Sequence, residues 1–341
     1  MIIVVTGAAG QIGYSLLPLL ANGSTFGPTA NVELRLLEIP QAVGALEGVK
    51  MELQDCAFPC LGDIVCTADA QAAFAGADVA VLVGGFPRRP GMLRKDLIQI
   101  NTKIFSGMGK ALDGAKPTCK VLVVANPANT NALTCIKNCS TLPAKNFAAM
   151  TRLDYNRATA QVALRLGTRV QNVKNVIIWG NHSATQFPDP TTDGVVVGAD
   201  GTRTALRSAL GGDEDIAWLQ GDFLSTVQQR GKAIIDARGK SSALSAAQAA
   251  ADCLRTWVTT GTSGGETVAM AVYNDSGYYG VAKDIVFSFP CECRGGEWLV
   301  KEGLTLTEYA HEKLKLSEAE LLEERAAAAE ILEAGAAGGT Q

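Results

Sequence analysis

Short, uninterrupted apolar runs alternate with helix-compatible segments through the first half of the chain, and this alternation constrains the fold more than any other feature. The runs cover residues 2–5, 32–37, 79–83 and 121–125. Strands that helices cover on both faces are apolar throughout instead of alternating. The helix-compatible segments between them are 11–21, 42–55 and 97–112. This βαβ rhythm predicts an α/β fold with a doubly wound parallel sheet and right-handed crossovers.

The regular alternation ends near residue 151, where longer amphipathic stretches begin. A chain of 341 residues, 47% of them hydrophobic, is long enough for two domains at roughly 100–200 residues each. We expect a first domain over residues 1–151 and a second, α+β domain over residues 152–332. The glycine-rich end of the chain, "EAGAAGGTQ", predicts a frayed tail over residues 333–341.

Composition argues against several classes of protein. A net charge of −4 gives no basic footprint for nucleic acid. No apolar run approaches the roughly 18 residues of a membrane span, and the first run reaches Gly7 too soon for a secretory signal. Nine cysteines, an odd number, indicate thiols in a reducing compartment. Cys291 and Cys293 lack a second pair, so we expect no metal site.

Three glycines follow the first predicted strand in "VVTGAAGQIG". We expect Gly7 to make a tight turn, Gly10 to let backbone approach a pyrophosphate, and Gly13 to let the next helix pack closely. Short-chain dehydrogenases and sugar epimerases share this spacing, but they pair a tyrosine with a lysine four residues later. Two such pairs occur here, in "YGVAK" and "YAHEK". The first lies in a glycine-bounded loop and the second in the acidic C-terminal helix, far from the predicted strand ends, so we interpret both as chance matches.

Glu38 ends the second predicted strand in "LLEIP". A carboxylate at this position can accept hydrogen bonds from both adenosine ribose hydroxyls and would repel a 2′-phosphate. The sequence therefore favours NAD over NADP as the dinucleotide.

Charged residues are also found in three further segments: "GGFPRRPGMLRKD" after the predicted strand 79–83, the helix-like "MTRLDYNRATA", and "NVIIWGNHSATQF", where they follow a strand-like apolar run. Asp154 and Arg157 are three residues apart, so on a helix they form either an ion pair or a functional pair. His182 follows an apolar strand. Oxidation of an alcohol by a nicotinamide needs a base such as imidazole, a carboxylate to orient it and a guanidinium for a substrate carboxylate. We assign these tasks to His182, Asp154 and Arg157, respectively.

These segments, together with "MELQDCAFP", "VVANPANTNALT", "TVQQRG", "SSALSAAQA" and "VFSFP", resemble the lactate/malate dehydrogenase family in its cytosolic malate-type branch. The likeness runs in the same order from residue 2 to about residue 330. It implies a Rossmann domain that binds NAD, followed by a catalytic domain, in a cytoplasmic homodimer. The implied reaction is the reversible oxidation of (S)-malate to oxaloacetate in the tricarboxylic acid cycle.

The resemblance also implies roles for individual residues. His182 and Asp154 match the catalytic pair, and Arg157 matches the arginine that holds the carboxylate next to the reacting carbon. Arg94 matches a mobile-loop arginine that polarises the carbonyl, and Arg88 matches the position that selects the second carboxylate. Asn126 matches a residue that contacts substrate and nicotinamide. The implied cofactor contacts are Gly7, Gly10, Gln11, Ile12, Gly13, Glu38, Asn101, Val124 and Asn126.

Two positions depart from the family pattern. Glu38 replaces the usual aspartate, and Tyr155 replaces a histidine next to the catalytic aspartate. Two other functions remain open. A lactate or other 2-hydroxyacid dehydrogenase would leave Arg88 unpaired against a methyl group, which is costly. A non-catalytic NAD-binding regulator would have no chemical need of His182, Asp154, Arg94 and Arg157.

Overall fold

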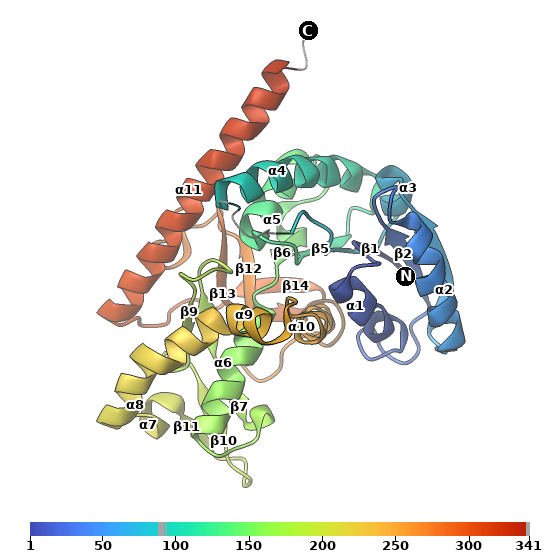
Figure 1. Ribbon diagram of the computed structural model, residues 1–341. Coiled ribbons are helices and arrows are strands. Elements are labelled where there is room, and N and C mark those ends of the chain that lie inside the picture. Colours follow the sequence, from blue (N-terminus) through green and yellow to red (C-terminus); the bar gives the residue numbers. More distant parts are fainter. Residues whose placement is uncertain (88–91, 93, 339–341) are drawn as a thin grey trace.

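A computed structural model describes residues 1–87, 92 and 94–338 (Figure 1). The strands are β1 (Ile2–Thr6), β2 (Val32–Leu37), β3 (Leu61–Thr67), β4 (Val79–Leu82), β5 (Lys120–Val123), β6 (Phe147–Ala149), β7 (Val173–Lys174), β8 (Ile177–Trp179), β9 (Phe187–Asp189), β10 (Val195–Val197), β11 (Arg203–Ala205), β12 (Val268–Tyr273), β13 (Val286–Arg294) and β14 (Glu297–Val300). The α-helices are α1 (Gln11–Ala21), α2 (Val43–Asp55), α3 (Ala70–Phe74), α4 (Arg94–Ala111), α5 (Ala128–Asn138), α6 (Arg152–Arg165), α7 (Leu206–Ala209), α8 (Asp213–Trp218), α9 (Leu224–Arg238), α10 (Leu244–Leu254) and α11 (Glu308–Gly338).

The main sheet of the described residues has the order β14-β13-β12-β6-β5-β4-β1-β2-β3. Strands β1 to β6 pair in parallel, which confirms the doubly wound α/β prediction. Strands β12, β13 and β14 come from the second half of the chain and extend the sheet in antiparallel fashion. The sheet is therefore mixed, with its parallel part built from the first half (Figure 1).

The sheet is buried on both faces, as the uniformly apolar runs predicted. Val5 and Val81 pack on one face with α1, α2 and α10, whereas Val4 and Leu82 pack on the other with α3, α4 and α5. The sequence pattern did not reveal β3, because this edge strand exposes part of its length and lacks a continuous apolar run.

The last helix, α11, continues to Gly338, although the pattern predicted helix only to residue 332 and a frayed tail beyond. Three of the added residues 333–338 are alanine, which has the highest helix propensity, although two are glycine. Residues 339–341 lie outside the described part. Figure 1 shows α11 running diagonally along one side of the molecule, and it contacts α4 and α5.

Each of the nine cysteines is a free thiol, and Cys291 and Cys293 are buried in β13. Across residues 1–87, 92 and 94–338, no three acidic, histidine or cysteine side chains converge as metal ligands. Over the same residues, no helix has the length and apolar composition needed to cross a bilayer.

Candidate active site

The turn between β1 and α1 is closed so tightly that two of its glycines have no room for a side chain. Gly7 has a φ of +65°, and a Cβ there would lie 2.6 Å from the Cα of Gly84. A Cβ at Gly13 would lie 2.5 Å from the Gly7 carbonyl oxygen. Gly7 therefore makes the turn, and Gly13 lets α1 pack on it. Gly84, which follows β4, is a partner that the sequence analysis missed although "VGGFP" follows a predicted strand.

The start of α1 is open to an anion. Gly10 is the N-cap, it supplies no side-chain cap, and the first turn holds no acidic residue. The first N–H groups of a helix have no partner within the helix and attract a phosphate. Gln11 is exposed and Ile12 partly exposed at this end. These residues fit the pyrophosphate of a dinucleotide.

Glu38 lies beside the same turn. Its Oε1 accepts a hydrogen bond from the backbone N–H of Ala9 at 3.1 Å, and its Oε2 accepts one from Ile39 at 3.2 Å. The side chain is partly exposed. The carboxylate is thus fixed next to the glycine turn, where it suits the ribose of NAD and repels a 2′-phosphate.

Asn101 is a buried side chain that hydrogen-bonds to the backbone that follows β4 and to the backbone that follows β5. It is fully buried; its Oδ1 accepts from the Phe86 N–H at 2.8 Å, and its Nδ2 donates to the carbonyls of Phe86 and Asn126 at 3.1 and 2.9 Å. The side chain of Asn126 is exposed, whereas Val124 is buried. Asn101 therefore holds the backbone of Asn126 in place, and its amide is already engaged.

Asp154 and His182 form a hydrogen-bonded pair, although they are far apart in the sequence. Asp154, in the first turn of α6, is fully buried, and its Oδ2 is bonded to Nδ1 of His182. The His182 side chain is 15% exposed. Because Nδ1 faces a carboxylate, the other nitrogen, Nε2, is left to exchange a proton with a bound molecule.

Two residues that the sequence analysis missed hold this pair. Gln186 donates from Nε2 to Asp154 Oδ1 at 3.2 Å. Asn129 accepts from the His182 backbone N–H at 3.0 Å, and its own amide donates to the carbonyls of Gly180 and Val286 at 3.2 and 2.9 Å. A buried asparagine near the start of α5, within "NPANTN", was the available signal.

Electrostatics keeps Asp154 ionised. Burial by itself raises the pKa of a carboxyl group, but His182 and Arg157 oppose burial and hold the pKa of Asp154 below its usual range. Burial also lowers the pKa of Arg157, an effect that Asp154 counteracts. At neutral pH the carboxylate therefore carries a negative charge behind the imidazole.

Arg157 pairs with Asp154 and can bind a second anion at the same time. Its Nη1 lies 3.3 Å from Asp154 Oδ1, so the intrahelical ion pair exists, and its Nη2 donates to Ser242 Oγ at 3.3 Å. Both contacts are long, and the side chain is 12% exposed. A guanidinium has five N–H groups in a planar fork, so several remain for a carboxylate.

The side chains of the other two predicted arginines lie outside the described part of the structure. Arg88 lies outside the described residues, and Arg94 begins α4 with a side chain that is also outside them. Tyr155 points into a different cluster, where it packs with Ala158 and Val176 and lies under the Arg152 guanidinium, 5.1 Å from its ring centre.

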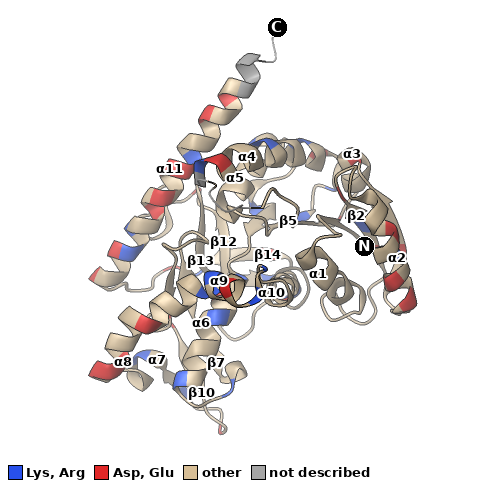
Figure 2. Cartoon of the chain, viewed as in Figure 1, with Lys and Arg blue, Asp and Glu red and all other residues tan. Residues whose placement is uncertain are grey.

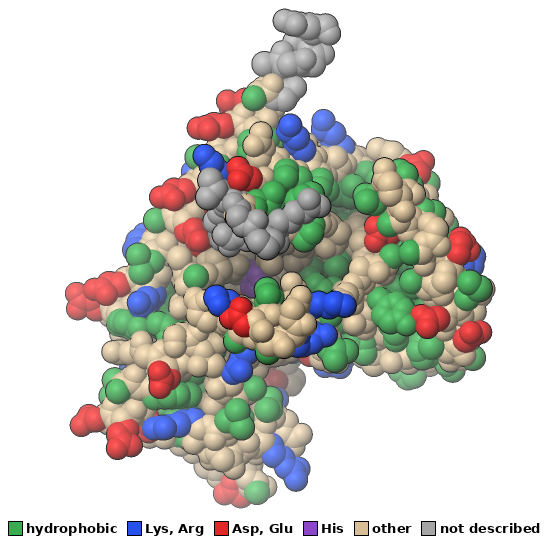
Figure 3. All heavy atoms as spheres, viewed as in Figure 1, with side chains coloured by type: hydrophobic (Ala, Val, Ile, Leu, Met, Phe, Trp, Pro, Cys, Tyr) green, Lys and Arg blue, Asp and Glu red, His purple; other side chains and the backbone are tan. Residues whose placement is uncertain are grey.

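The surface around the pair suits an anionic substrate. Figure 3 shows a hollow on this face with histidine surface inside it. Figure 2 shows Lys and Arg positions on α6 and α9, and the positive charge of Arg230 on α9 lowers the pKa of Arg157.

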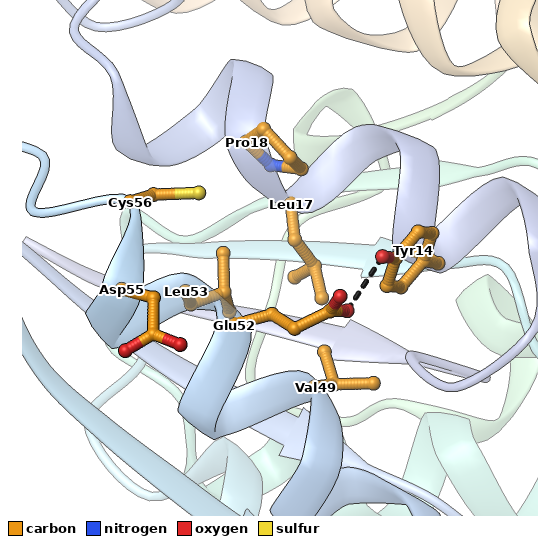
Figure 4. Close-up of a pocket in the computed structure, with 8 residues that line it drawn as sticks. All are labelled: Tyr14, Leu17, Pro18, Val49, Glu52, Leu53, Asp55 and Cys56. Carbon is orange, nitrogen blue, oxygen red and sulfur yellow. Dashed lines mark hydrogen bonds between the residues drawn. The ribbon is translucent and has the colours of Figure 1, made fainter.

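A separate pocket of about 370 Å³ lies between α1 and α2 (Figure 4). Tyr14 Oη donates to Glu52 Oε2 across it at 2.5 Å. Its lining includes Glu52 and Asp55 but no lysine or arginine, so it would repel a dicarboxylate. This pocket is therefore a poorer candidate for binding an anionic substrate than the surface around His182.

Comparison with known proteins agrees with this geometry. Residues 1–148 match the family model "lactate/malate dehydrogenase, NAD binding domain", and residues 151–331 match "lactate/malate dehydrogenase, alpha/beta C-terminal domain". The chain belongs to the lactate/malate dehydrogenase family, and it carries the family's NAD-binding domain.

Relatives in this family cover nearly the whole chain. The cytoplasmic malate dehydrogenase of Caenorhabditis elegans is 53% identical over 95% of each chain, and that of Homo sapiens is 50% identical over 97% of each. The malate dehydrogenase of Naegleria fowleri is 45% identical with a TM-score of 0.90, covering 97% of this chain and 98% of that one. The lactate dehydrogenase of Trichomonas vaginalis, solved with NADH and oxamate, is 37% identical with a TM-score of 0.91, covering 97% and 99%.

Proposed function

We propose that the protein catalyses the reversible NAD-dependent oxidation of (S)-malate to oxaloacetate. The observation that carries this proposal is the buried Asp154 carboxylate, which contacts both His182 and Arg157. One carboxylate thereby fixes a proton acceptor and an anion-binding cation next to each other. Relatives of about 50% identity over nearly the full length are named malate dehydrogenase, which supports the same substrate.

In this mechanism Arg157 binds the substrate carboxylate that adjoins the reacting carbon. His182 then takes the hydroxyl proton at Nε2, and the Asp154 carboxylate stabilises the resulting imidazolium. NAD, when bound, supplies the acceptor for the hydride. In the reverse direction the imidazolium returns its proton to the carbonyl oxygen. Asn126 contacts substrate and nicotinamide at the end of β5, and Asn101 keeps its backbone there.

The family also contains lactate dehydrogenases, so substrate choice needs its own argument. Lactate lacks the second carboxylate of malate. We assign recognition of that carboxylate to Arg88, with Arg94 acting on the reacting oxygen; the structure describes neither side chain. A guanidinium facing the methyl group of pyruvate would be desolvated without a partner.

NADH oxidation with oxaloacetate and pyruvate, measured in parallel and repeated with NADPH, tests the function. We expect oxaloacetate to be reduced faster than pyruvate by at least about 10²-fold in kcat/KM, which corresponds to roughly 3 kcal/mol of charge pairing. We expect NADH to be preferred over NADPH because of Glu38. Equal rates on the two acids would contradict the assignment of Arg88, and a preference for NADPH would contradict that of Glu38.

Replacing Arg88 with glutamine is expected to lower kcat/KM for oxaloacetate by about 10²-fold, because the second carboxylate loses its ionic partner. Activity on pyruvate should rise, because the unpaired charge is gone. Steady-state kinetics of Arg88→Gln on both acids measure this. Unchanged oxaloacetate kinetics would show that another residue holds the second carboxylate.

We also propose that the protein is cytoplasmic, as its relatives' names support, and that it is a homodimer, as the family resemblance implies. Exposed Met51 and Tyr14 lie on α2 and α1, which border the pocket in Figure 4, and they provide apolar surface for a second copy. Sedimentation velocity measures the mass, and a monomer at all concentrations would contradict the dimer.

A further inference from the structure

Helix α11 contacts the segment that carries His182 through polar side chains on one of its faces. We define this segment as residues 180–185. Ser317 Oγ accepts from the backbone N–H of Asn181 at 2.7 Å. Glu320 Oε2 accepts from the side chains of Asn181, Ser183 and Thr185 at 2.9, 2.5 and 2.6 Å. Positions 317, 320 and 324 share a helix face, so one face of α11 holds the whole segment.

Glu324 joins the same segment to the NAD-binding half of the chain. Its Oε1 accepts from Asn181 Nδ2 at 3.1 Å, and its Oε2 accepts from the hydroxyl of Thr130 on α5. Glu324 is 3% exposed. A buried carboxylate is costly unless hydrogen bonds satisfy it, so these contacts keep the groups at fixed separations.

The approach of α11 to the segment is unusually close. Gly180 has a φ of +96°, and a Cβ there would lie 2.1 Å from Ser317 Oγ. Only glycine fits this position, so the helix and the backbone just before His182 are in direct contact.

We propose that Glu320 and Glu324 are positioning residues for His182. They set where the imidazole stands relative to the start of α5, and therefore relative to a substrate held beside the nicotinamide. The inference rests on the function proposed above. Both carboxylates hold the segment through hydrogen bonds that include one from Asn181, and Glu320 also accepts from Ser183 and Thr185, whereas Glu324 also accepts from Thr130. A displacement of about 1 Å at a reacting group costs on the order of 10²-fold in rate, so small shifts of this segment matter.

Glu320→Ala tests the proposal, with Glu320→Gln as the conservative variant. We expect kcat to fall by about 10- to 10²-fold in Glu320→Ala, with KM for NADH nearly unchanged. Because misalignment slows the chemical step, the primary isotope effect with deuterated NADH should rise. Glu320→Gln keeps an acceptor oxygen and should recover part of the rate. Glu324→Gln should likewise lower kcat and raise the isotope effect relative to the wild type.

Two controls separate positioning from folding. Glu323, one residue before Glu324, is exposed, so Glu323→Ala should match the wild type. Glu318 fixes α11 elsewhere, since its Oε1 accepts from the Ala282 N–H at 2.6 Å. Glu318→Ala should lower the melting temperature without raising the isotope effect. If the isotope effect rises equally in Glu318→Ala and Glu320→Ala, then Glu320 only fixes α11 in general. That result would overturn the proposal.

A readout without turnover comes from the imidazole ¹⁵N spectrum, which contains only His182 and His311. His311→Gln assigns the two signals. We expect the His182 signals to move in Glu320→Ala and Glu320→Gln, and to stay in place in Glu323→Ala. Unchanged signals together with a wild-type isotope effect in both Glu320 variants would overturn the proposal. Wild-type protein that prefers pyruvate would overturn the proposed substrate and leave this spectral test intact. If Glu320→Ala does not fold, Glu320→Gln and Glu324→Gln decide the outcome.

Discussion

Replacing His182 with asparagine is expected to lower kcat by about 10²- to 10⁴-fold, the usual contribution of a general acid–base group. Asparagine keeps a polar side chain at this position, but it cannot take the hydroxyl proton of malate. NADH binding should persist, because the glycine turn and Glu38 belong to a different part of the structure. Stopped-flow turnover and NADH fluorescence titration measure the two effects separately.

The same variant tests whether the protein is a catalyst at all. A regulator that only binds NAD would show no turnover in the wild type, so His182→Asn would change nothing. An enzyme that uses another base would keep a near-normal rate. Wild-type turnover with a variant that binds NADH but does not turn over is the result expected of the His182 mechanism.

Much of the fold could be predicted from the sequence, because strands buried on both faces are apolar throughout. The runs at 2–5 and 79–83 correspond to β1 and β4 for this reason. Strand β3 was not predicted, because an edge strand is partly exposed and its residues form no continuous apolar run. The antiparallel extension by β12 to β14 was not predicted. Strand pairing depends on contacts between distant segments, and a local sequence pattern does not record them.

Some residues of the candidate site could likewise be predicted from the sequence, and others could not. Asp154 and His182 were predicted from residue types suited to acid–base chemistry, and the structure brings their side chains together. Gln186, Asn129 and Glu320 act by holding other groups, and an amide or a carboxylate in a holding role looks like any other in the sequence. Gly84 is a further case, because its need for glycine comes from Gly7, far away in the sequence. Arg88 and Arg94 remain sequence-based assignments.

Replacing Asp154 with asparagine is expected to lower kcat by about 10²- to 10⁴-fold, comparable to loss of the orienting aspartate in a catalytic triad. The amide removes the charge that stabilises the imidazolium and no longer fixes the proton on Nδ1. It also leaves Arg157 buried without its carboxylate. Since the folded-state pKa of Asp154 is lowered, its contribution to stability is complete above the ordinary aspartate pKa of about 3.9 and is lost as the pH falls further. The stability difference between wild type and Asp154→Asn should therefore narrow below about pH 4, as urea unfolding at several pH values will show.

Combining Asp154→Asn with His182→Asn shows how the aspartate acts. If Asp154 works through the imidazole, the double variant should be hardly slower than His182→Asn alone, because groups that act as a unit give non-additive losses. A loss that instead multiplies would mean that Asp154 has a second path to the reaction. Arg157 is the neighbour that could provide it, since Asp154 Oδ1 also contacts that guanidinium. That path would appear as a raised KM for oxaloacetate in the Asp154→Asn background, whereas the path through His182 would lower kcat at nearly constant KM.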